Sequence, residues 1–402
     1  MNVIVIGGGA AGMTAALTAA ENGHRVTLLE RQARVGRKLL ATGNGRCNLT
    51  NRHAAPVHYH GQMPDFCRQA LAAFTVEDTL AWFARLGLVT VTEDSGRVYP
   101  FSNMAGSVLD VLRFALEHAA IDVRTGYVVT GIKRQSGGFR VRVESGEEFT
   151  ADKLILSAGG AAGGKVGGVM DGYQLAKGLG HHRTALYPSL VQLKTDPTYP
   201  RSLKGIKAEA IVSICQNGQT LTQERGEILF TEYGVSGPAI FDISRTAAVS
   251  GNGLTLVLDL LPDWTADDTH LWLRQRRDTA GNREAGTLLT GTLHTRLGQM
   301  VCKAAGFTGQ SAAALSDREL AHIAAQAKRF SLPVTGVCGF DQAQVTAGGL
   351  RCDEFDPGTM ESLLVPGFYA CGEVLDIDGD CGGYNLQWAW SSGRMAGQLR
   401  TI

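Results

Sequence analysis

Over the first thirty positions an apolar run, a segment of small residues and a second apolar run follow one another, and this order predicts one βαβ unit. Residues 2–6, NVIVI, form a β-branched apolar run of the kind found in strands buried on both faces. Residues 13–22 are rich in alanine and contain no Pro or Gly, which predicts a helix ending at Gly23. A second apolar run, residues 25–29, predicts the next strand, which ends at Glu30.

A glycine pattern lies between that strand and that helix. Residues 7–12 are GGGAAG, a G-x-G-x-x-G pattern in which the glycines allow a tight turn, close approach to a pyrophosphate and close helix packing. The helix N-terminus favours an anion, and Glu30, eighteen residues after Gly12, is placed to bind a ribose. The alternative is a purely structural turn. The arrangement predicts a site for NAD or FAD, without choosing between them, at Gly7, Gly9, Ala10, Ala11, Gly12 and Glu30.

Further along, the pattern changes character twice. Helical periodicity predicts helices near residues 75–87 and 105–119, and short alternating runs predict strands at 122–124, 128–133, 139–144, 148–151 and 153–157. We therefore expect an α/β fold with a Rossmann-like dinucleotide-binding domain, an inserted β-barrel-like domain and a small helical subdomain. The expected boundaries are residues 1–186 plus 340–402 for the first, 187–262 for the inserted β domain, and 263–339 for the helical subdomain and the return.

Composition narrows the class of protein. A chain of 402 residues exceeds one typical core. Lys+Arg and Asp+Glu balance at 38 each, which argues against a broadly electrostatic nucleic-acid or membrane binder. No run of eighteen apolar residues and no basic segment ahead of the first apolar run occurs, so we expect neither a membrane span nor a signal peptide. Eight cysteines without paired spacing favour reduced thiols in a cytoplasmic protein and no metal site.

A basic, glycine-containing loop follows Glu30. Five basic residues lie between Arg31 and Arg46, and Gly43 and Gly45 would let backbone N–H groups lie against a flat ring. The alternative is a solvated basic loop. The cofactor-wrapping interpretation, which we favour, names Arg31, Lys38, Thr42, Gly43, Asn44, Gly45, Arg46, Cys47 and Asn48.

Two longer stretches carry a resemblance. Residues 36–51, GRKLLATGNGRCNLTN, and 372–393, GEVLDIDGDCGGYNLQWAWSSG, resemble the signature of a bacterial family of FAD-dependent oxidoreductases, the HI-type or YhiN-like flavoproteins. The resemblance covers nearly the whole chain and implies FAD rather than NAD. It also implies cofactor contacts from Val128 or Val129, from Ala158, Gly159 and Gly160, and from Gly372 and Glu373. A glycine turn at residues 379–387 would lead into a helix at 388–399 that points at the flavin edge, with Gly383, Tyr384, Asn385 and Leu386 as cofactor contacts.

Candidate chemistry gathers in the same motifs. The flavin would carry the electrons, and the protein would orient it and supply protons. Cys47 and Tyr384 are the main proton-donor candidates, with Tyr59 and His60 behind them. Arg46 is expected either to bind substrate or to neutralise a cofactor phosphate. Cys47 and Cys381 both lie in flavin-adjacent motifs and are candidates for a redox pair or for small packing residues.

The resemblance implies reduction of an activated C=C bond in a small molecule or a nucleobase, with NADH or NADPH as a transient reductant. Three alternatives remain at this point, of which one is a flavin-binding protein without turnover and the other two are enzymes. One is an amine or aminoketone oxidase that passes electrons to oxygen. The other is a ribosomal-RNA-associated flavoenzyme that forms dihydrouridine, for which the basic stretch 31–52 and the arginines near residues 274–283 are the supporting features.

Overall fold

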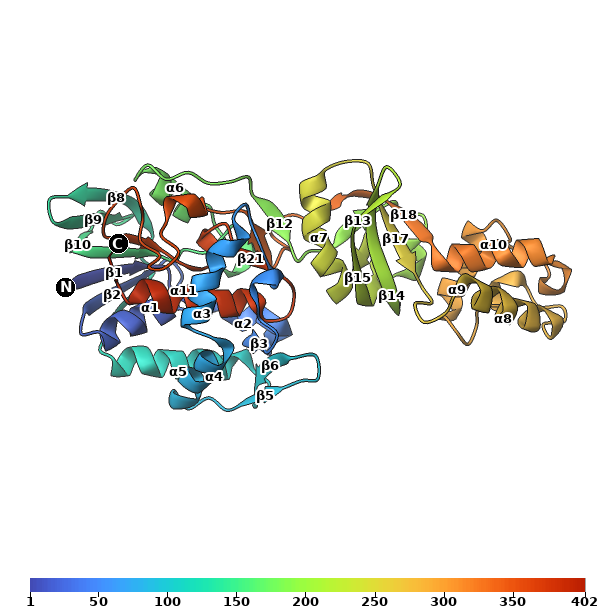
Figure 1. The fold of residues 1–402 in the computed structure, drawn as a ribbon, viewed down its shortest axis with the longest axis horizontal. Helices are drawn as coiled ribbons and strands as arrows, with labels where there is room; N and C mark the ends of the chain where they lie inside the picture. The colour runs from blue at the N-terminus through green and yellow to red at the C-terminus, as the bar shows by residue number, and fades with distance from the viewer. Residues whose placement is uncertain (402) are drawn as a thin grey trace. The chain divides into compact units, whose positions relative to one another are not determined.

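The structure, a computed structural model, describes residues 1–401 and divides into two compact units. One unit comprises Met1–Tyr187 and the chain from Ala343 onward, and the other comprises Pro188–Gln342. The chain leaves the first unit along β12 (Tyr187–Ser189) and re-enters it along β19 (Val345–Ala347). Figure 1 shows the helices and strands of both units.

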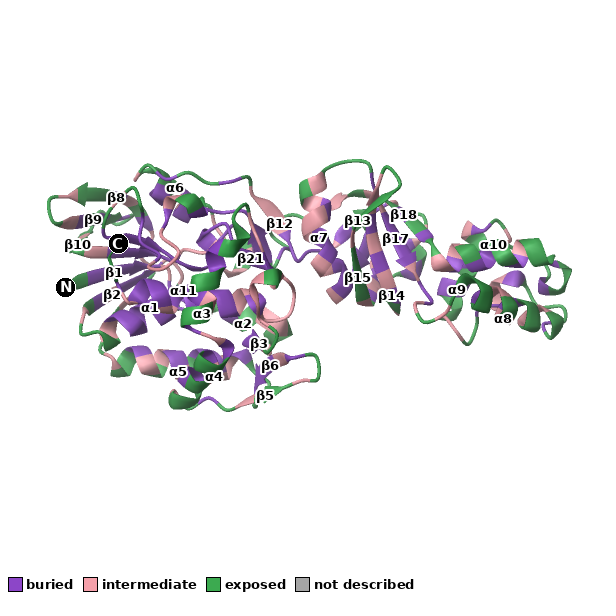
Figure 2. Cartoon of the chain, in the orientation of Figure 1, coloured by how far each residue is buried: buried purple, intermediate pink, exposed green. Residues whose placement is uncertain are grey.

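A five-stranded parallel sheet forms the centre of the first unit. Its strands lie in the order β20 (Phe368–Ala370), β11 (Lys153–Leu156), β1 (Asn2–Ile6), β2 (Arg25–Glu30) and β7 (Asp122–Thr125). The β1 strand is buried from its second residue to its last, because sheet neighbours and packed layers cover both of its faces (Figure 2). The predicted first βαβ unit is confirmed, with α1 (Ala10–Glu21) between β1 and β2.

Two helices that are far apart in the sequence, α1 and α11 (Tyr384–Gly397), lie side by side (Figure 1). A Cβ atom at Gly393 would lie 2.5 Å from the carbonyl oxygen of Ala11, and one at Gly397 would lie equally close to that of Ala15. Only glycine permits this approach. Because both numbers rise by four from the first contact to the second, the two helices run parallel.

The remaining elements of the first unit surround this core. Between β2 and β7 lie α2 (Arg37–Ala41), β3 (Thr50–Asn51), β4 (Tyr59–His60), α3 (Cys67–Ala73), α4 (Val76–Arg85), β5 (Thr90–Thr92), β6 (Arg97–Pro100) and α5 (Ala105–His118). The predicted meander is β8 (Val129–Gln135), β9 (Gly138–Val143) and β10 (Glu148–Ala151), and α6 (Asp171–Lys177) and β21 (Asp378–Gly379) complete the unit. The α4 helix begins at the expected cap, where Thr75 and Asp78 form a capping box.

The second unit contains a closed barrel. Its strands are connected in the order β13 (Leu193–Thr195), β16 (Gly234–Ser236), β15 (Gln219–Phe230), β14 (Lys207–Gln216), β17 (Leu254–Asp259) and β18 (Phe330–Val337). The same unit contains α7 (Pro238–Ser250), α8 (Ala266–Asp278), α9 (Thr295–Ala304) and α10 (Asp317–Lys328). Strand β18 lies in the segment expected to return the chain to the first domain. There it closes the barrel, because Phe330 and Leu332 alternate with exposed residues and the strand pairs with β17 and β13.

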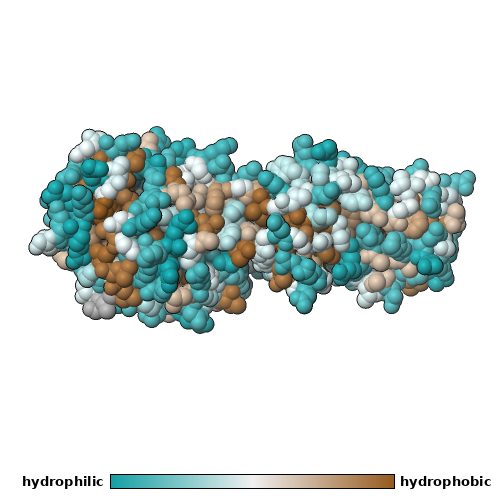
Figure 3. Space-filling view, turned by 90° about the horizontal axis from the view of Figure 1, so that it is seen from above, coloured by the Kyte–Doolittle hydropathy of each residue, from teal (hydrophilic) through white to brown (hydrophobic). Residues whose placement is uncertain are grey.

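The surface is mixed in character. Figure 3 shows hydrophobic side chains gathered in patches among larger hydrophilic areas. Within residues 1–401, no helix has the length and apolar character needed to cross a membrane.

Candidate functional site

Several predicted cofactor segments meet at one edge of the parallel sheet. They follow the carboxyl ends of β1, β2, β11 and β20. From β1 the sheet grows in two directions, with β2 and β7 on one side and β11 and β20 on the other. A Cβ at Gly7 would lie 2.4 Å from the carbonyl oxygen of Ser157, and one at Gly372 would lie 2.7 Å from the Cβ of Ala11. The structure therefore brings residues 7–12, 158–160 and 372–373 together at a topological switch point, where open α/β sheets bind ligands.

Glu30 organises the glycine loop. One carboxylate oxygen accepts the N–H of Gly8 and the other accepts the N–H of Gln32, both at 2.7 Å. Because a carboxylate offers about four acceptor positions, capacity for a ribose hydroxyl remains. The N–H of Tyr127 donates to the carbonyl of Glu30 at 2.9 Å, so Val128 and Val129 follow directly at this end of β2.

The basic residues after Glu30 pair with carboxylates. Arg31 lies 2.6 Å from Asp171, and Lys38 lies 2.7 Å from Glu373, another predicted cofactor residue. Arg46 lies 2.7 Å from Glu93, and its guanidinium stacks 3.9 Å from the ring centroid of Tyr99. The hydrogen bond to Glu93 raises the pKa of Arg46. These pairs fix the loop in place, and the suggested substrate role of Arg46 stays a prediction.

The turn around Cys47 has an unusual backbone. Gly43, Asn44 and Cys47 all have positive φ angles, of 56°, 56° and 61°. The Cys47 side chain is fully buried, and burial raises the pKa of its thiol to about 12. The thiol is therefore protonated at neutral pH. None of the eight cysteines forms a disulfide, and the structure leaves the role of Cys47 in proton supply as a prediction.

The start of α11 closes on the Asn48 loop. Gly383 has φ +104°, and a Cβ there would lie 2.5 Å from the Thr50 backbone and 2.9 Å from Oδ1 of Asn48. This Oδ1 atom is buried and has no hydrogen-bond partner among the described residues. Asn385 holds the preceding turn by accepting the N–H of Gly379 at 2.8 Å and donating to its carbonyl at 2.7 Å.

These features fit a long dinucleotide cofactor. The α1 helix begins one residue before Ala11, whereas α11 begins nine residues before Gly393, its contact with Ala11. At 1.5 Å per residue, the two parallel N-termini are offset by about 12 Å. Each end presents free N–H groups. No atom would meet a Cβ at Gly9 or Gly159 within 4 Å, so the loops are open where a pyrophosphate is expected. Near the N-terminus of α11, the unpaired Oδ1 of Asn48 could accept a hydrogen bond from a bound ligand.

A cluster of two histidines and one carboxylate lies beside the start of α11. The antiparallel pair of β4 and β21 sets Asp378 opposite His60 and Gly379 opposite Tyr59. His58 Nδ1 lies 2.9 Å from Asp380 Oδ2, and His60 Nε2 lies 2.6 Å from Asp380 Oδ1. Asp380 was not among the site residues predicted from the sequence. The signal that could have found it is the spacing of His58 and His60, which places both rings on one side of an extended segment.

Tyr384 and Tyr59 adjoin this cluster. The Tyr384 ring stacks on His58 with centroids 4.3 Å apart. The Tyr59 hydroxyl donates to the Tyr384 carbonyl at 3.0 Å, and burial raises the pKa of Tyr59 well above its usual value. Tyr384 is the first residue of α11, which begins four residues earlier than the helix expected at 388–399, and its catalytic role stays a prediction.

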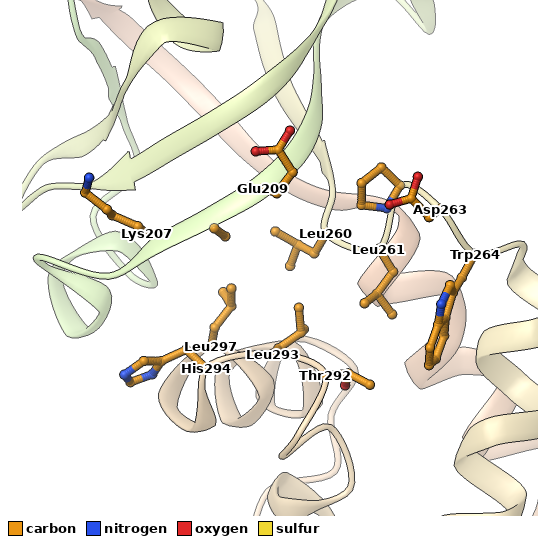
Figure 4. A pocket seen from close by; sticks show the side chains of 12 residues that line it. Lys207, Glu209, Leu260, Leu261, Asp263, Trp264, Thr292, Leu293, His294 and Leu297 are labelled. Carbon is orange, nitrogen blue, oxygen red and sulfur yellow. The ribbon is translucent and has the colours of Figure 1, made fainter. Parts of the chain in front are cut away.

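A separate pocket of about 280 Å³ lies within the second unit. Its walls come from β14, the turn at residues 260–264 and the start of α9 (Figure 4). Leucines at 260, 261, 293 and 297 line it, and Lys207 and Asp263 are occupied by ion pairs with Glu227 and Arg225. None of the predicted site residues lies in this pocket. Within residues 1–401, no group of three or more His, Cys, Asp or Glu side chains could hold a metal ion.

Comparison with known proteins identifies the family. Residues 1–399 match the family described as HI0933-like protein Rossmann domain. The chain belongs to this family. The predicted fold class, an α/β fold with a Rossmann-like FAD-binding domain, an inserted β-barrel and a helical subdomain, is confirmed.

Curated relatives match along almost their full length. The chain is 37% identical over 400 residues to a 3-dehydro-bile acid delta(4,6)-reductase of Clostridium scindens, covering 98% of this chain and 97% of that protein. It is 31% identical over 393 residues to a ribosomal RNA dihydrouridine synthase of Escherichia coli, covering 97% and 96%. A solved flavocytochrome c3 fumarate reductase matches with a TM-score of 0.47 and 17% identity, covering 99% of this chain and 77% of that one.

Proposed function

We propose that this protein is an FAD-dependent oxidoreductase that uses NADH or NADPH to reduce an activated C=C bond in a small molecule. The observation that carries the proposal is the pair of parallel helix N-termini, offset by about 12 Å, with the family's glycine loops around them. The relative from C. scindens, named as a reductase of 3-dehydro-bile acids, supports the reaction type. Its name suggests a 3-oxo steroid with 4,6 double bonds as the first compound to test.

In this proposal the first unit would hold FAD along the sheet edge. Residues 7–12 would receive the pyrophosphate at the N-terminus of α1, and Glu30 would accept from the ribose. Residues 158–160 and 372–373 would form the floor of the cradle. When bound, FAD supplies the hydride that a C=C reduction requires.

At the other end, the N-terminus of α11 would face the ring. The N–H groups after Gly383 would stabilise negative charge that develops there, because they are fixed in position before reaction. Asn48 Oδ1, buried and unpaired, would accept a hydrogen bond from a ring N–H. Tyr59 is buried beside this turn, with its hydroxyl bonded to the Tyr384 carbonyl.

Ribosomal RNA is the second candidate substrate, since the relative from E. coli is named as acting on it. The arginines of α8 are weak support for RNA binding, because two of them are already paired with carboxylates. Arg274 and Arg277 both contact Asp317, and Arg277 also contacts Asp278. Salt-dependent binding of structured ribosomal RNA by the purified protein, together with dihydrouridine formation, would replace the small-molecule proposal.

The first experiment measures the visible spectrum of the purified protein before and after addition of NADH or NADPH. We expect flavin absorbance that bleaches with one of the two nucleotides. The reduced protein is then mixed separately with oxygen and with the 3-oxo-4,6-diene steroid. Rapid reoxidation by the steroid with formation of saturated product supports the proposal, whereas rapid turnover with oxygen and none with the steroid supports the amine or aminoketone oxidase alternative.

A further inference from the structure

The cluster of His58, His60 and Asp380 has a geometry suited to moving protons. Asp380 accepts from both imidazoles, one on each carboxylate oxygen, at 2.9 Å and 2.6 Å. Each ring therefore uses one nitrogen on the carboxylate. No described residue bonds to the other nitrogen of either ring, Nε2 of His58 or Nδ1 of His60, so both are available to solvent or to a ligand.

The backbone of Asp380 is held in place as well. The N–H of Asp380 donates to the carbonyl of His58 at 3.0 Å, and Asn385 Nδ2 contacts the Asp380 carbonyl at 3.3 Å. Burial acts to raise the pKa of Asp380, but the bonds from His60 and His58 outweigh it and hold that pKa below its ordinary value. Asp380 is therefore ionised at neutral pH. It orients both rings and balances the charge when one of them is protonated.

The two rings differ in their surroundings. His58 stacks on Tyr384, so its ring plane is held against the start of α11. The His60 side chain is 37% exposed, more than that of His58 at 30%, and has no aromatic neighbour of this kind. Both rings have an open nitrogen, but the His60 ring is the more exposed of the two and is not stacked on another described ring, so it is better placed to meet a ligand. His58, held by its stack on Tyr384, is assigned a positioning role.

We propose that His60 donates the proton that completes C=C reduction, with Asp380 and His58 as positioning residues. This inference rests on the proposed function and adds the proton donor to it. Bound flavin would supply a hydride to one carbon, the π electron pair would move to the neighbouring carbon, and the Nδ1 proton of His60 would form the second C–H bond. His60 is left neutral and regains a proton from water through its half-exposed edge.

Several elements packed against the cluster contribute a titratable side chain. Asp380 comes from the turn before α11, Tyr384 from α11, Tyr59 from β4 and Cys67 from α3. Asp376 accepts the N–H of Gln62 at 3.1 Å, on the chain that continues from His60. Burial raises the pKa of the thiol of Cys67 to about 12, and that of Tyr59 well above its ordinary value, so neither titrates near neutrality.

The test compares His60→Gln, Asp380→Asn and Tyr384→Phe, with the exposed His182→Gln as the control. Glutamine can still donate to Asp380 but cannot release a proton. In stopped-flow mixing we expect His60→Gln to be reduced normally by dithionite but to be reoxidised by the 3-oxo-4,6-diene steroid about 100-fold more slowly. The pH dependence of that reoxidation is lost in His60→Gln and retained in His182→Gln.

A second readout does not depend on turnover. In the purified protein labelled with ¹⁵N at histidine, we expect the ring-nitrogen signals of His58 and His60 to show their hydrogen bonds to Asp380 and to lose them in Asp380→Asn. Unchanged reoxidation in His60→Gln, loss of the pH dependence in Tyr384→Phe instead, or absence of these hydrogen bonds in the wild type would each overturn the inference. If the wild-type reduced protein is not reoxidised by the steroid at all, the proposed function fails. If the wild type is reoxidised and His60→Gln is reoxidised equally fast, the inference alone fails.

Discussion

At the scale of single residues, Gly383 is the position where a side chain would do most damage to the proposed cofactor site. Its φ of +104° disfavours any other residue, and a Cβ would collide with the Thr50 backbone. We expect Gly383→Ala to shift the start of α11 and to reduce the flavin-to-protein absorbance ratio at least several-fold.

The matched control is Gly126→Ala. Gly126 has φ +79°, but nothing lies within 4 Å of its Cβ position. This variant carries only the backbone strain of about 1 kcal/mol and should retain its flavin. Equal flavin loss in both variants would mean that strain alone, and not the contact with residues 48–50, explains the effect.

Burial of the Cys47 thiol predicts a dependence of stability on pH. The ordinary thiol pKa is 9.0, and the folded value is about 12. Since the unfolded chain loses this proton first, the contribution of Cys47 is fully present below pH 9 and falls as pH rises from 9 towards 12. Between pH 9 and pH 10 the loss is about 1 kcal/mol.

The measurement is urea unfolding of wild type and Cys47→Ala at pH 7, 9 and 10. We expect the stability difference between them to shrink by about that amount from pH 9 to pH 10. The control is Leu49→Ala, which removes another fully buried side chain two residues away and has no proton to lose. A constant difference for Cys47→Ala across all three pH values would show that burial does not raise this pKa.

At the scale of elements, Gln387 ties α11 to its neighbours. It accepts from the Thr50 hydroxyl at 2.6 Å and donates to Thr79 Oγ1 at 2.9 Å, and both contacts are buried. We expect Gln387→Met to cost about 2–3 kcal/mol, because the Thr50 hydroxyl loses its buried partner. The substitution should also weaken flavin retention, since β3 and the start of α11 enclose Asn48, a predicted cofactor residue.

Chemical denaturation and the flavin absorbance ratio measure these two effects. Gln398→Met, at the C-cap of the same helix, is the control and should change both values little. If Gln387→Met loses stability but keeps full flavin occupancy, the hydrogen bonds of Gln387 do not contribute to flavin retention.

The elements also show which parts of the fold the sequence could predict. The β1–α1–β2 unit was predictable because apolar period, glycine spacing and the terminal acid all lie within thirty residues. The two-residue strands β4 and β21 were not, because they are defined only by pairing between residues about 320 positions apart. Asp380 was missed for the same reason. Its partners on β4 become neighbours only when both ends of the chain meet.

At the scale of the whole molecule, the chain builds two separate hydrophobic cores. One core contains buried residues from the first unit only, among them Leu28 and Leu154. The other contains residues from the barrel and its helices, among them Leu256 and Leu320. The predicted cofactor residues all belong to the first unit, so a ligand bound there should stabilise one core directly and leave the other unchanged.

Calorimetry can test this separation. We expect two unfolding transitions, and removal of flavin should lower the midpoint of only one of them, because a ligand stabilises only the cooperative unit that binds it. Leu154→Ala should lower the flavin-sensitive transition and Leu256→Ala the other, each by roughly 2–5 kcal/mol in unfolding free energy for a fully buried leucine. A single transition that responds equally to flavin and to both substitutions would show that the two cores unfold as one unit. In that case substitutions in the barrel would change flavin retention as strongly as those in the sheet.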